Sequence, residues 1–169
     1  MAVAAIFLCQ PASPAGAAIS SDYVYNISNA AGGGDCTLIG YWDPVTLTCT
    51  LGSDISFGSG TDGIYIDSDG ITLDGNGYAL TGDPTRDTHG VYLSGRTGVT
   101  VKNLHISQFR YGIYLYDSDS NTLTNNNASS NDWDGIALNG AANNTISGNV
   151  CSGSASYDGL SLSLHGQHD

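Results

Sequence analysis

The sequence contains no glutamate, and only four of its 169 residues are lysine or arginine. All 16 acidic residues are therefore aspartate, which favours turns, whereas glutamate favours helices. The few bases cannot form the clustered positive surface that phosphate contacts require. The composition thus argues against a helical protein and against a nucleic-acid partner. The four bases are Arg86, Arg96, Lys102 and Arg110.

Apolar runs are also scarce, and the longest lies at the N-terminus, from Ala2 to Cys9, followed by Ala15-Gly16-Ala17. A short apolar stretch before small residues is typical of a signal peptide, so we expect residues 1–18 to be one, although no basic residue begins it. The alternative is a buried apolar strand. Nothing later approaches the roughly 20 apolar residues of a membrane span. We expect a secreted, cell-surface or periplasmic protein.

Glycine, in contrast, is abundant at 23 residues, and part of it recurs regularly. A tetrapeptide with apolar residues two apart begins at Gly90, Gly112, Gly135 and Gly159. The intervals are 22, 23 and 24 residues (112 − 90, 135 − 112, 159 − 135). An earlier copy begins at Gly63. A period near 23 indicates a solenoid, in which each repeat buries its apolar face against its neighbours.

Each repeat places apolar or small residues at three points, which predicts three short strands per coil. The fold class is therefore all-β, and we expect a three-sheet parallel β-helix, right-handed because parallel connections follow that rule. The inward residues are Val91, Leu93, Ile113, Leu115, Ile136, Leu138, Leu160 and Leu162 on the first strand, Val101, Leu123 and Ile146 on the second, and Ile106, Ala128 and Cys151 on the third.

Two polar columns are expected to stack along the solenoid. Asn76, Asn126 and Asn149 lie at similar distances from their glycines, and stacked amides can hydrogen-bond from coil to coil. Threonines occupy the outward position of the second strand, as in ice-binding solenoids. The mixed residues two positions further on favour ordinary β-propensity instead. These threonines are Thr72, Thr100, Thr122 and Thr145.

Three segments carry a resemblance to a known family: Ser-Asp-Gly-Ile-Thr-Leu-Asp-Gly-Asn-Gly (68–77), Gly-Val-Thr-Val-Lys-Asn-Leu (98–104) and Asn-Asn-Thr-Ile-Ser-Gly-Asn (143–149). The chain resembles right-handed parallel β-helix repeat proteins of the pectin-lyase-like superfamily, and within it the NosD-type periplasmic repeat proteins. The resemblance covers roughly residues 55–169 and implies the fold. It leaves the function open, because this solenoid carries lyases, epimerases, adhesins and binding proteins.

Residues 19–60 differ from the repeats and are expected to form an N-terminal cap. Two β-rich runs, 36–42 and 45–49, flank Asp43-Pro44, which predicts a hairpin closed by a disulfide between Cys36 and Cys49. Such a cap would cover the open end of the core. Similar proteins carry a Cys-paired segment before the first coil. The alternative, a redox or metal pair, lacks the Cys-x-x-Cys spacing and a nearby histidine.

Residues 61–169 are expected to form the repeats, with an incomplete last coil that begins at Gly159. Three explanations remain open: a truncated chain, end-to-end self-association, or a tolerated ragged end. Truncation is favoured, and self-association through the uncapped coil is the expected consequence.

A ligand-binding surface is predicted on the first strands. Tyr65, Tyr92 and Tyr114 occupy equivalent outward positions, with Tyr116 beside them, and acidic residues such as Asp134 precede the glycines. Flat rings beside carboxylates suit a polysaccharide or cell-surface glycan. The alternative is that tyrosines stack across strands for stability alone.

A catalytic cluster is the second hypothesis. Arg86, Asp87 and His89 lie in the longest insertion, and Arg110 follows one coil later. Polysaccharide lyases, C5-epimerases and glycoside hydrolases on this fold need acid, base and cation groups. Thr85 stands where the Asp-Pro-His motif of the epimerases has histidine, and the net charge of −12 repels uronate polymers. An enzyme is therefore the less favoured interpretation.

A metal site is the third hypothesis. Asp67, Asp69 and Asp74 offer oxygen ligands that suit calcium, although aspartates that cap turns are the simpler interpretation. His165 and His168 could bind copper or zinc, or belong to a solvated tail. No other cofactor is expected. The overall prediction is an exported solenoid that binds carbohydrate or extracellular matrix, with a polysaccharide-active enzyme using residues 83–111, or a structural fragment without a ligand, as alternatives.

Overall fold

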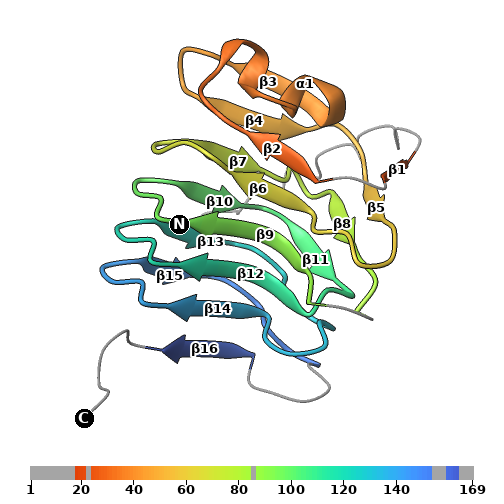
Figure 1. Cartoon of the computed structure of the whole chain (residues 1–169), viewed down its shortest axis with the longest axis vertical. Coiled ribbons are helices and arrows are strands. Elements are labelled where there is room, and N and C mark those ends of the chain that lie inside the picture. The colour runs from red at the N-terminus through yellow and green to blue at the C-terminus, as the bar shows by residue number, and fades with distance from the viewer. Residues whose placement is uncertain (1–17, 22–23, 85–86, 154–158, 164–169) are drawn as a thin grey trace, which may run out of the picture.

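A computed structural model describes residues 18–21, 24–84, 87–153 and 159–163. The chain forms a parallel β-solenoid of about five turns, whose strands stack in three sheets (Figure 1). One sheet has the order β1-β5-β8-β11, the second β15-β13-β10-β7-β4-β3 and the third β16-β14-β12-β9-β6-β2. The expected fold class is confirmed.

The strands are short because each coil turns three corners. The first sheet contains β1 (Ile19–Ser21), β5 (Ile55–Phe57), β8 (Ala79–Thr81) and β11 (His105–Ser107). The second contains β3 (Gly40–Asp43), β4 (Thr48–Leu51), β7 (Thr72–Asp74), β10 (Thr100–Lys102), β13 (Thr122–Thr124) and β15 (Thr145–Ser147). The third contains β2 (Tyr25–Ile27), β6 (Ile64–Ile66), β9 (His89–Ser94), β12 (Tyr111–Tyr116), β14 (Ile136–Asn139) and β16 (Leu160–Ser163).

The register of the strands follows the repeat read from the sequence. Val91 pairs with Ile113, and Ile113 with Ile136, so residues at equivalent repeat positions stack from coil to coil. Their side chains are fully buried, as are Leu123 and Val101 on the second strand. Burying each such side chain stabilises the fold by roughly 1.5–3 kcal/mol, and no coil can bury them alone.

The repeated glycines have a packing role. A Cβ atom on Gly90 would collide with the Gly112 carbonyl oxygen and the Ile106 side chain, and one on Gly112 would collide with the Gly135 carbonyl oxygen. The backbones of successive coils therefore approach closely at this corner, where only glycine leaves room for the next backbone. This close approach explains the recurrence that reveals the solenoid in the sequence.

The N-terminal hairpin is present, with β3 antiparallel to β4 and a Cys36–Cys49 disulfide. The prediction that residues 36–42 are all strand is wrong. Residues Cys36–Ile39 form a single helical turn, α1, preceded by the 3-10 turn η1 (Ala31–Gly33). A helical turn buries Cys36 and Ile39, three residues apart, and leaves Leu38 57% exposed, whereas alternation would have buried Leu38.

The segment before residue 60 is continuous with the solenoid. Its strands β1, β2, β4 and β5 pair in parallel with strands of the next coil, so they belong to all three sheets. Among the strands of the described ranges, β3 alone runs antiparallel; it lies at the end of its sheet and covers the first coil (Figure 1).

Three buried asparagines occupy the corners of one coil: Asn121, Asn126 and Asn131 are at most 2% exposed. Each side-chain oxygen accepts a backbone N–H of the preceding coil, and each side-chain amide donates to a backbone carbonyl there. The backbone groups that turn each corner are thereby satisfied inside the core.

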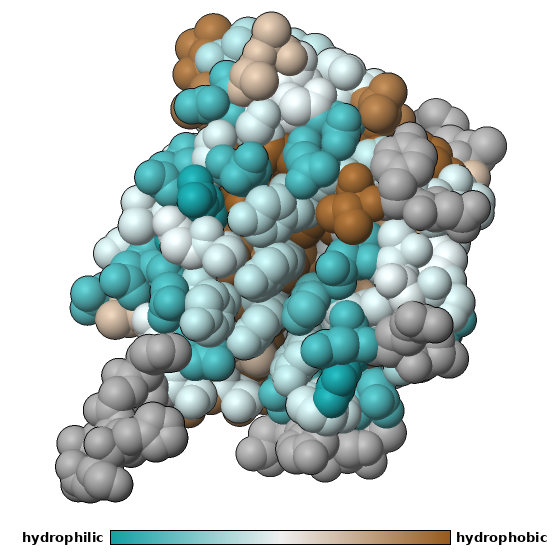
Figure 2. Space-filling model, viewed as in Figure 1, coloured by the Kyte–Doolittle hydropathy of each residue, from teal (hydrophilic) through white to brown (hydrophobic). Residues whose placement is uncertain are grey.

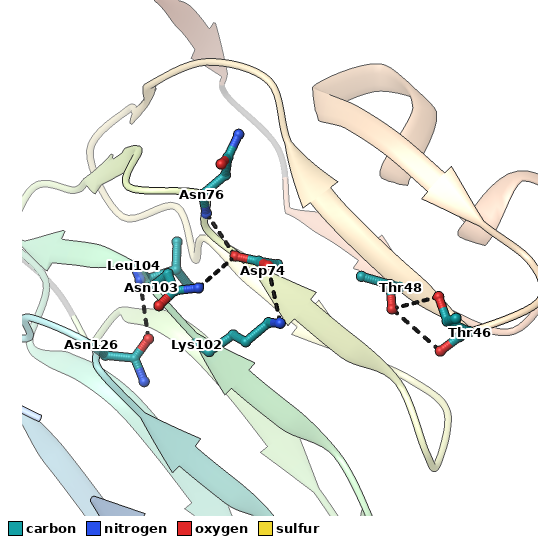
Figure 3. A network of polar contacts seen from close by, with 8 residues as sticks. All are labelled: Thr46, Thr48, Asp74, Asn76, Lys102, Asn103, Leu104 and Asn126. Carbon is teal, nitrogen blue, oxygen red and sulfur yellow. Dashed lines mark hydrogen bonds and ion pairs between the residues drawn. The ribbon is translucent and has the colours of Figure 1, made fainter. Parts of the chain in front are cut away.

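The expected amide ladder joins Asn126 to Asn149, whose Oδ1 accepts the Asn126 side-chain amide at 3.0 Å. The assignment of Asn76 to this ladder is wrong. Asn76 is exposed at a turn with φ of 52°, and its backbone N–H donates to Asp74 Oδ1 at 2.9 Å (Figure 3). Asn76 therefore belongs to an exposed turn and not to the buried amides, so position within the repeat alone does not identify the ladder.

The threonine column is longer than the sequence suggested, because Thr48 of the hairpin is in register with Thr72.

At the other end of the solenoid, β16 pairs only with β14 among the described strands. Leu160 and Leu162 on β16 are 44% and 65% exposed, although their repeat positions face inward.

Candidate functional site: an aromatic face on the third sheet

The outward face of the third sheet carries a column of tyrosine rings. Tyr65, Tyr92 and Tyr114 are in register on β6, β9 and β12. The ring centroids of Tyr65 and Tyr92 are 5.4 Å apart, and those of Tyr92 and Tyr114 are 5.6 Å apart. These side chains are half-buried, so the column is accessible on one side.

A second column lies against the first at the beginning of the strands. The His89 ring is 5.0 Å from both Tyr92 and Tyr114, at interplanar angles of 22° and 12°. Tyr111, in register with His89, stacks on Tyr114 at 5.0 Å. Trp133 meets Tyr111 edge-on at 5.5 Å. We call these six side chains, Tyr65, Tyr92, His89, Tyr114, Tyr111 and Trp133, the aromatic face.

The rings of the inner part of the aromatic face cover one another. Tyr92 and Tyr114 are almost parallel, at 11°, and His89 lies against both. Because the faces of the Tyr92, Tyr114 and His89 rings are covered by one another, mainly the ring edges and the tyrosine hydroxyl groups remain accessible to solvent. Tyr65, at the end of the column, is tilted by 38° from Tyr92, and its strand neighbour on the other side is Asn26, which has no ring to cover it.

A groove of about 310 Å³ opens at that end of the column. Figure 2 shows this side of the molecule, with a pale row of side chains across its centre and a hollow beside the row. The groove begins beside Tyr65 and is bordered by both apolar and polar groups. Its lining residues are Val24, Asn26, Asp62, Ile64, Tyr65 and Tyr92.

Asp62 joins the groove to the second column. Its Oδ1 accepts the backbone N–H of His89 at 2.8 Å and lies 3.0 Å from His89 Nδ1. When Nδ1 carries the proton, this contact fixes the tautomer and the ring orientation, and leaves Nε2 as the acceptor. An aspartate that orients a histidine is also a common acid–base arrangement.

Arg110 lies at the other end of the second column. Its guanidinium carbon is 3.3 Å from the centroid of the Trp133 ring, a cation–π contact. Its Nη1 is 3.2 Å from Asp87 Oδ1, and the Asp87 side chain is 67% exposed. The predicted cation and acid thus bind each other. Arg86, the remaining member of the predicted catalytic cluster, lies outside the described residues.

Tyr111 has a perturbed hydroxyl group. Burial raises its pKa to about 12, with Asp87 adding to the shift and Arg110 opposing it. Like any phenol, Tyr111 is neutral and can donate a hydrogen bond at physiological pH, and the raised pKa keeps it neutral at alkaline pH as well.

The two remaining predicted ligand-binding residues have different positions. Tyr116 is in register with Ser94 and Asn139, two residues beyond Tyr114 on the same side of the sheet. Asp134 is only 7% exposed, and its charge contributes to the raised pKa of the Tyr111 hydroxyl, so it lies against the aromatic face with little accessible surface. Trp133, which the sequence analysis did not single out, occupies the surface beside it.

The predicted calcium ligands serve the turns of the second sheet. Asp69 accepts the Thr97 N–H at 2.9 Å. Asp74 accepts Asn103 Nδ2 at 3.0 Å and pairs with Lys102 Nζ at 3.1 Å (Figure 3). Burial alone would raise the pKa of Asp74, but these hydrogen bonds and the Lys102 charge lower it. The Asp67 backbone oxygen accepts Arg96 Nη1 at 3.3 Å, and its backbone N–H donates to the Ile27 carbonyl oxygen at 2.8 Å.

Metal-binding groups are scattered over the described part of the chain, where no three His, Cys, Asp or Glu side chains form a cluster that could hold an ion. Cys151 is half-buried, and burial raises the pKa of its thiol, which disfavours a reactive thiolate. His165 and His168 lie outside the described residues.

Comparison with protein families identifies the chain. A family model described as "Periplasmic copper-binding protein (NosD)" matches residues 19–168, nearly the whole sequence. The chain belongs to the NosD family. The match extends the resemblance noted for residues 55–169 to the N-terminal hairpin. Comparisons of this NosD-family chain with curated proteins and with solved structures give no match. Across the described ranges, no helix is long and apolar enough to cross a membrane.

Proposed function

We propose that this NosD-family protein is an exported solenoid that binds carbohydrate through its aromatic face. The observation that carries the proposal is the exposed groove beside Tyr65, where an aromatic ring, an amide and a carboxylate meet. Sugar rings have apolar faces and hydroxyl edges, so they need an aromatic surface together with hydrogen-bonding groups. The periplasmic family supports an exported location.

The solenoid suits a long ligand for a geometric reason. Equivalent residues of successive coils repeat along the sheet at the strand spacing of roughly 4.8 Å. The Tyr65–Tyr92–Tyr114 column therefore presents hydroxyl groups in a row, one for each coil. Tyr114 Oη also accepts the Asn139 side-chain amide at 3.3 Å, which holds that hydroxyl in place.

An acid–base enzyme is the second candidate, and the Asp62–His89 pair is the observation that favours it. Arg110 binds Asp87 and stacks on Trp133, so among the residues that the structure describes no lysine or arginine contacts the Asp62–His89 pair to neutralise a substrate carboxylate. Release of unsaturated or reducing sugar from a polysaccharide, lost in His89→Ala, would establish the enzyme over the binding protein.

Copper, which the family description names, does not fit the described residues. Copper sites need several nitrogen or sulfur ligands in one place, and those ranges hold no such cluster. His89 is stacked between tyrosines, with its Nδ1 against Asp62. We therefore do not extend copper binding to this part of the chain.

A glycan array with the full chain tests the proposal, run with calcium and with chelator. Tyr92→Ala and Tyr114→Ala disrupt the aromatic face, and Tyr41→Ala is the matched control, because Tyr41 is 69% exposed on the hairpin. We expect binding by the wild type and by Tyr41→Ala, with a loss in the other two variants. Calcium dependence would implicate the Asp67–Asp74 region. No binding to any glycan, in a chain with a β-type circular dichroism spectrum, would refute the proposal.

A further inference from the structure

The Tyr65–Tyr92–Tyr114 column has an open ring surface at its Tyr65 end, and the position of this surface singles out a binding subsite. Tyr92 lies between the rings of Tyr65 and Tyr114, and Tyr114 stacks on both Tyr92 and Tyr111, so a sugar cannot stack on either ring without separating the aromatic face. The outer side of Tyr65 adjoins the groove instead. A sugar that stacks on an aromatic ring therefore has its place at the end of the column.

The groove has hydrogen-bonding groups on two sides of that ring. Asn26 is exposed on β2, in register with Tyr65, and no contact of its side-chain amide is present among the described residues. Asp62 uses Oδ1 for His89, while its Oδ2 has no described partner, and its side chain is 39% exposed. An amide and a carboxylate oxygen on either side of a ring can bind the hydroxyl or amine groups at the edge of a pyranose.

The charge of the groove restricts the ligand. None of its lining residues is basic, one is an aspartate, and the chain carries a net charge of −12. A uronate would place its carboxylate near Asp62 without a compensating cation, which costs free energy in a partly desolvated site. A hydroxyl or ammonium group would instead donate to Asp62. The volume of about 310 Å³ is at the small end of ligand pockets, which are roughly 300–1,000 Å³.

We propose that the groove between Asn26 and Tyr65 is the subsite that holds one non-acidic pyranose of the glycan, stacked on Tyr65 with its hydroxyl or amine donors turned toward Asp62. This inference rests on the proposed function. In this arrangement the other rings of the aromatic face hold Tyr65 in place, and the hydroxyl groups of Tyr92 and Tyr114 continue the binding surface along the solenoid.

The decisive variant fills the groove without removing any ring. Asn26→Tyr would continue the column by one ring in register with Tyr65 and cover its open side, on a strand where tyrosine is well tolerated. Asn26→Ala is the matched control, since it removes the amide and leaves the ring uncovered. Unchanged thermal unfolding of both variants shows that the fold is intact.

Isothermal titration uses three tetrasaccharides: neutral β-1,4-glucose, β-1,4-glucosamine and α-1,4-galacturonate. We expect the first two to bind the wild type and the third not to bind. Asn26→Tyr should lose binding, whereas Asn26→Ala should weaken it by about tenfold at most. Asp62→Asn should reduce the preference for the glucosamine tetramer over the glucose tetramer.

Two outcomes overturn the inference while the proposed function stands: equal binding by Asn26→Tyr and the wild type, or tighter binding of the galacturonate tetramer. If the wild type binds none of the three and no glycan on the array, both the inference and the proposed function fail.

Discussion

The side-chain Oδ1 of Asn126 accepts the backbone N–H of Leu104, a residue of the preceding coil, at 3.2 Å. The same side chain donates to the Val101 carbonyl oxygen at 2.9 Å, and all three residues are buried. One amide therefore satisfies a donor and an acceptor that have no access to water. Because the strands are only three residues long, backbone N–H and C=O groups at the corners have no partner in a sheet. The inward Asn126 side chain supplies the hydrogen bonds that a neighbouring strand would otherwise make.

Asn126→Ala should destabilise the solenoid by about 1–3 kcal/mol, because it leaves buried backbone groups unpaired. Urea denaturation followed by circular dichroism measures the change. Asn26→Ala, an asparagine-to-alanine change at an exposed position, should stay within about 0.5 kcal/mol of the wild type. Equal midpoints for the two variants would show that the buried amide contributes nothing to stability.

The disulfide joins residues 13 apart and ties α1 to β4. Closing a loop of this length restricts the unfolded chain, so Cys36→Ala/Cys49→Ala should lower the free energy of unfolding by about 3 kcal/mol. Thermal unfolding with and without reductant is the measurement. Wild type and Cys151→Ala should both lose stability when reduced, and the double variant should not respond. A double variant that still responds to reductant would disprove the assignment.

The sequence repeat predicts the core residues, because the same requirement, burial of every second residue of each strand, determines the repeat and the core. The pairing of Val91 with Ile113 follows directly from the positions of their glycines. The hairpin was harder to predict, because two runs of β-formers do not reveal that Cys36–Ile39 closes into a helical turn. Tertiary contacts at the disulfide override the local preference there.

The aromatic face was predictable only in part. The tyrosine column follows from alternation, but the position of His89 against Tyr92 and Tyr114 depends on side-chain packing between coils. Trp133 was missed in favour of its neighbour Asp134, which turned out to be buried. The sequence did contain one signal, because Trp133 lies one repeat after Arg110 and so should be its neighbour in the next coil. The structure shows this register, with the Trp133 backbone N–H donating to the Arg110 carbonyl oxygen at 2.9 Å.

Arg110→Ala should cost more stability than Asp87→Ala, although the two residues form one ion pair. Arg110 is 26% exposed and lies flat on Trp133, a contact of roughly 0.5–2 kcal/mol, whereas an ion pair to the exposed Asp87 contributes about 0–1 kcal/mol. Urea denaturation gives both values. Tryptophan emission should shift in Arg110→Ala because Trp133 loses its cover, while Trp42, which is buried in the hairpin of the wild type, should contribute a constant background. A larger effect of Asp87→Ala would mean that the ion pair dominates.

Tyr111 makes stability depend on pH at the alkaline end. Burial raises the pKa of its hydroxyl from 10.0 to about 12, so the folded state holds the phenolic proton more tightly than the unfolded state does. The stabilisation of the folded state by the protonated Tyr111 hydroxyl is therefore fully present below pH 10.0 and is lost as the pH rises toward 12. Urea denaturation between pH 9 and pH 12, roughly the span of the two pKa values, compares the wild type with Tyr111→Phe. The wild type should lose stability relative to this variant above pH 10.0, and the exposed Tyr41→Phe is the control. A constant difference across the range would show that the Tyr111 hydroxyl ionises equally in both states, and that its environment in the aromatic face is as polar as water.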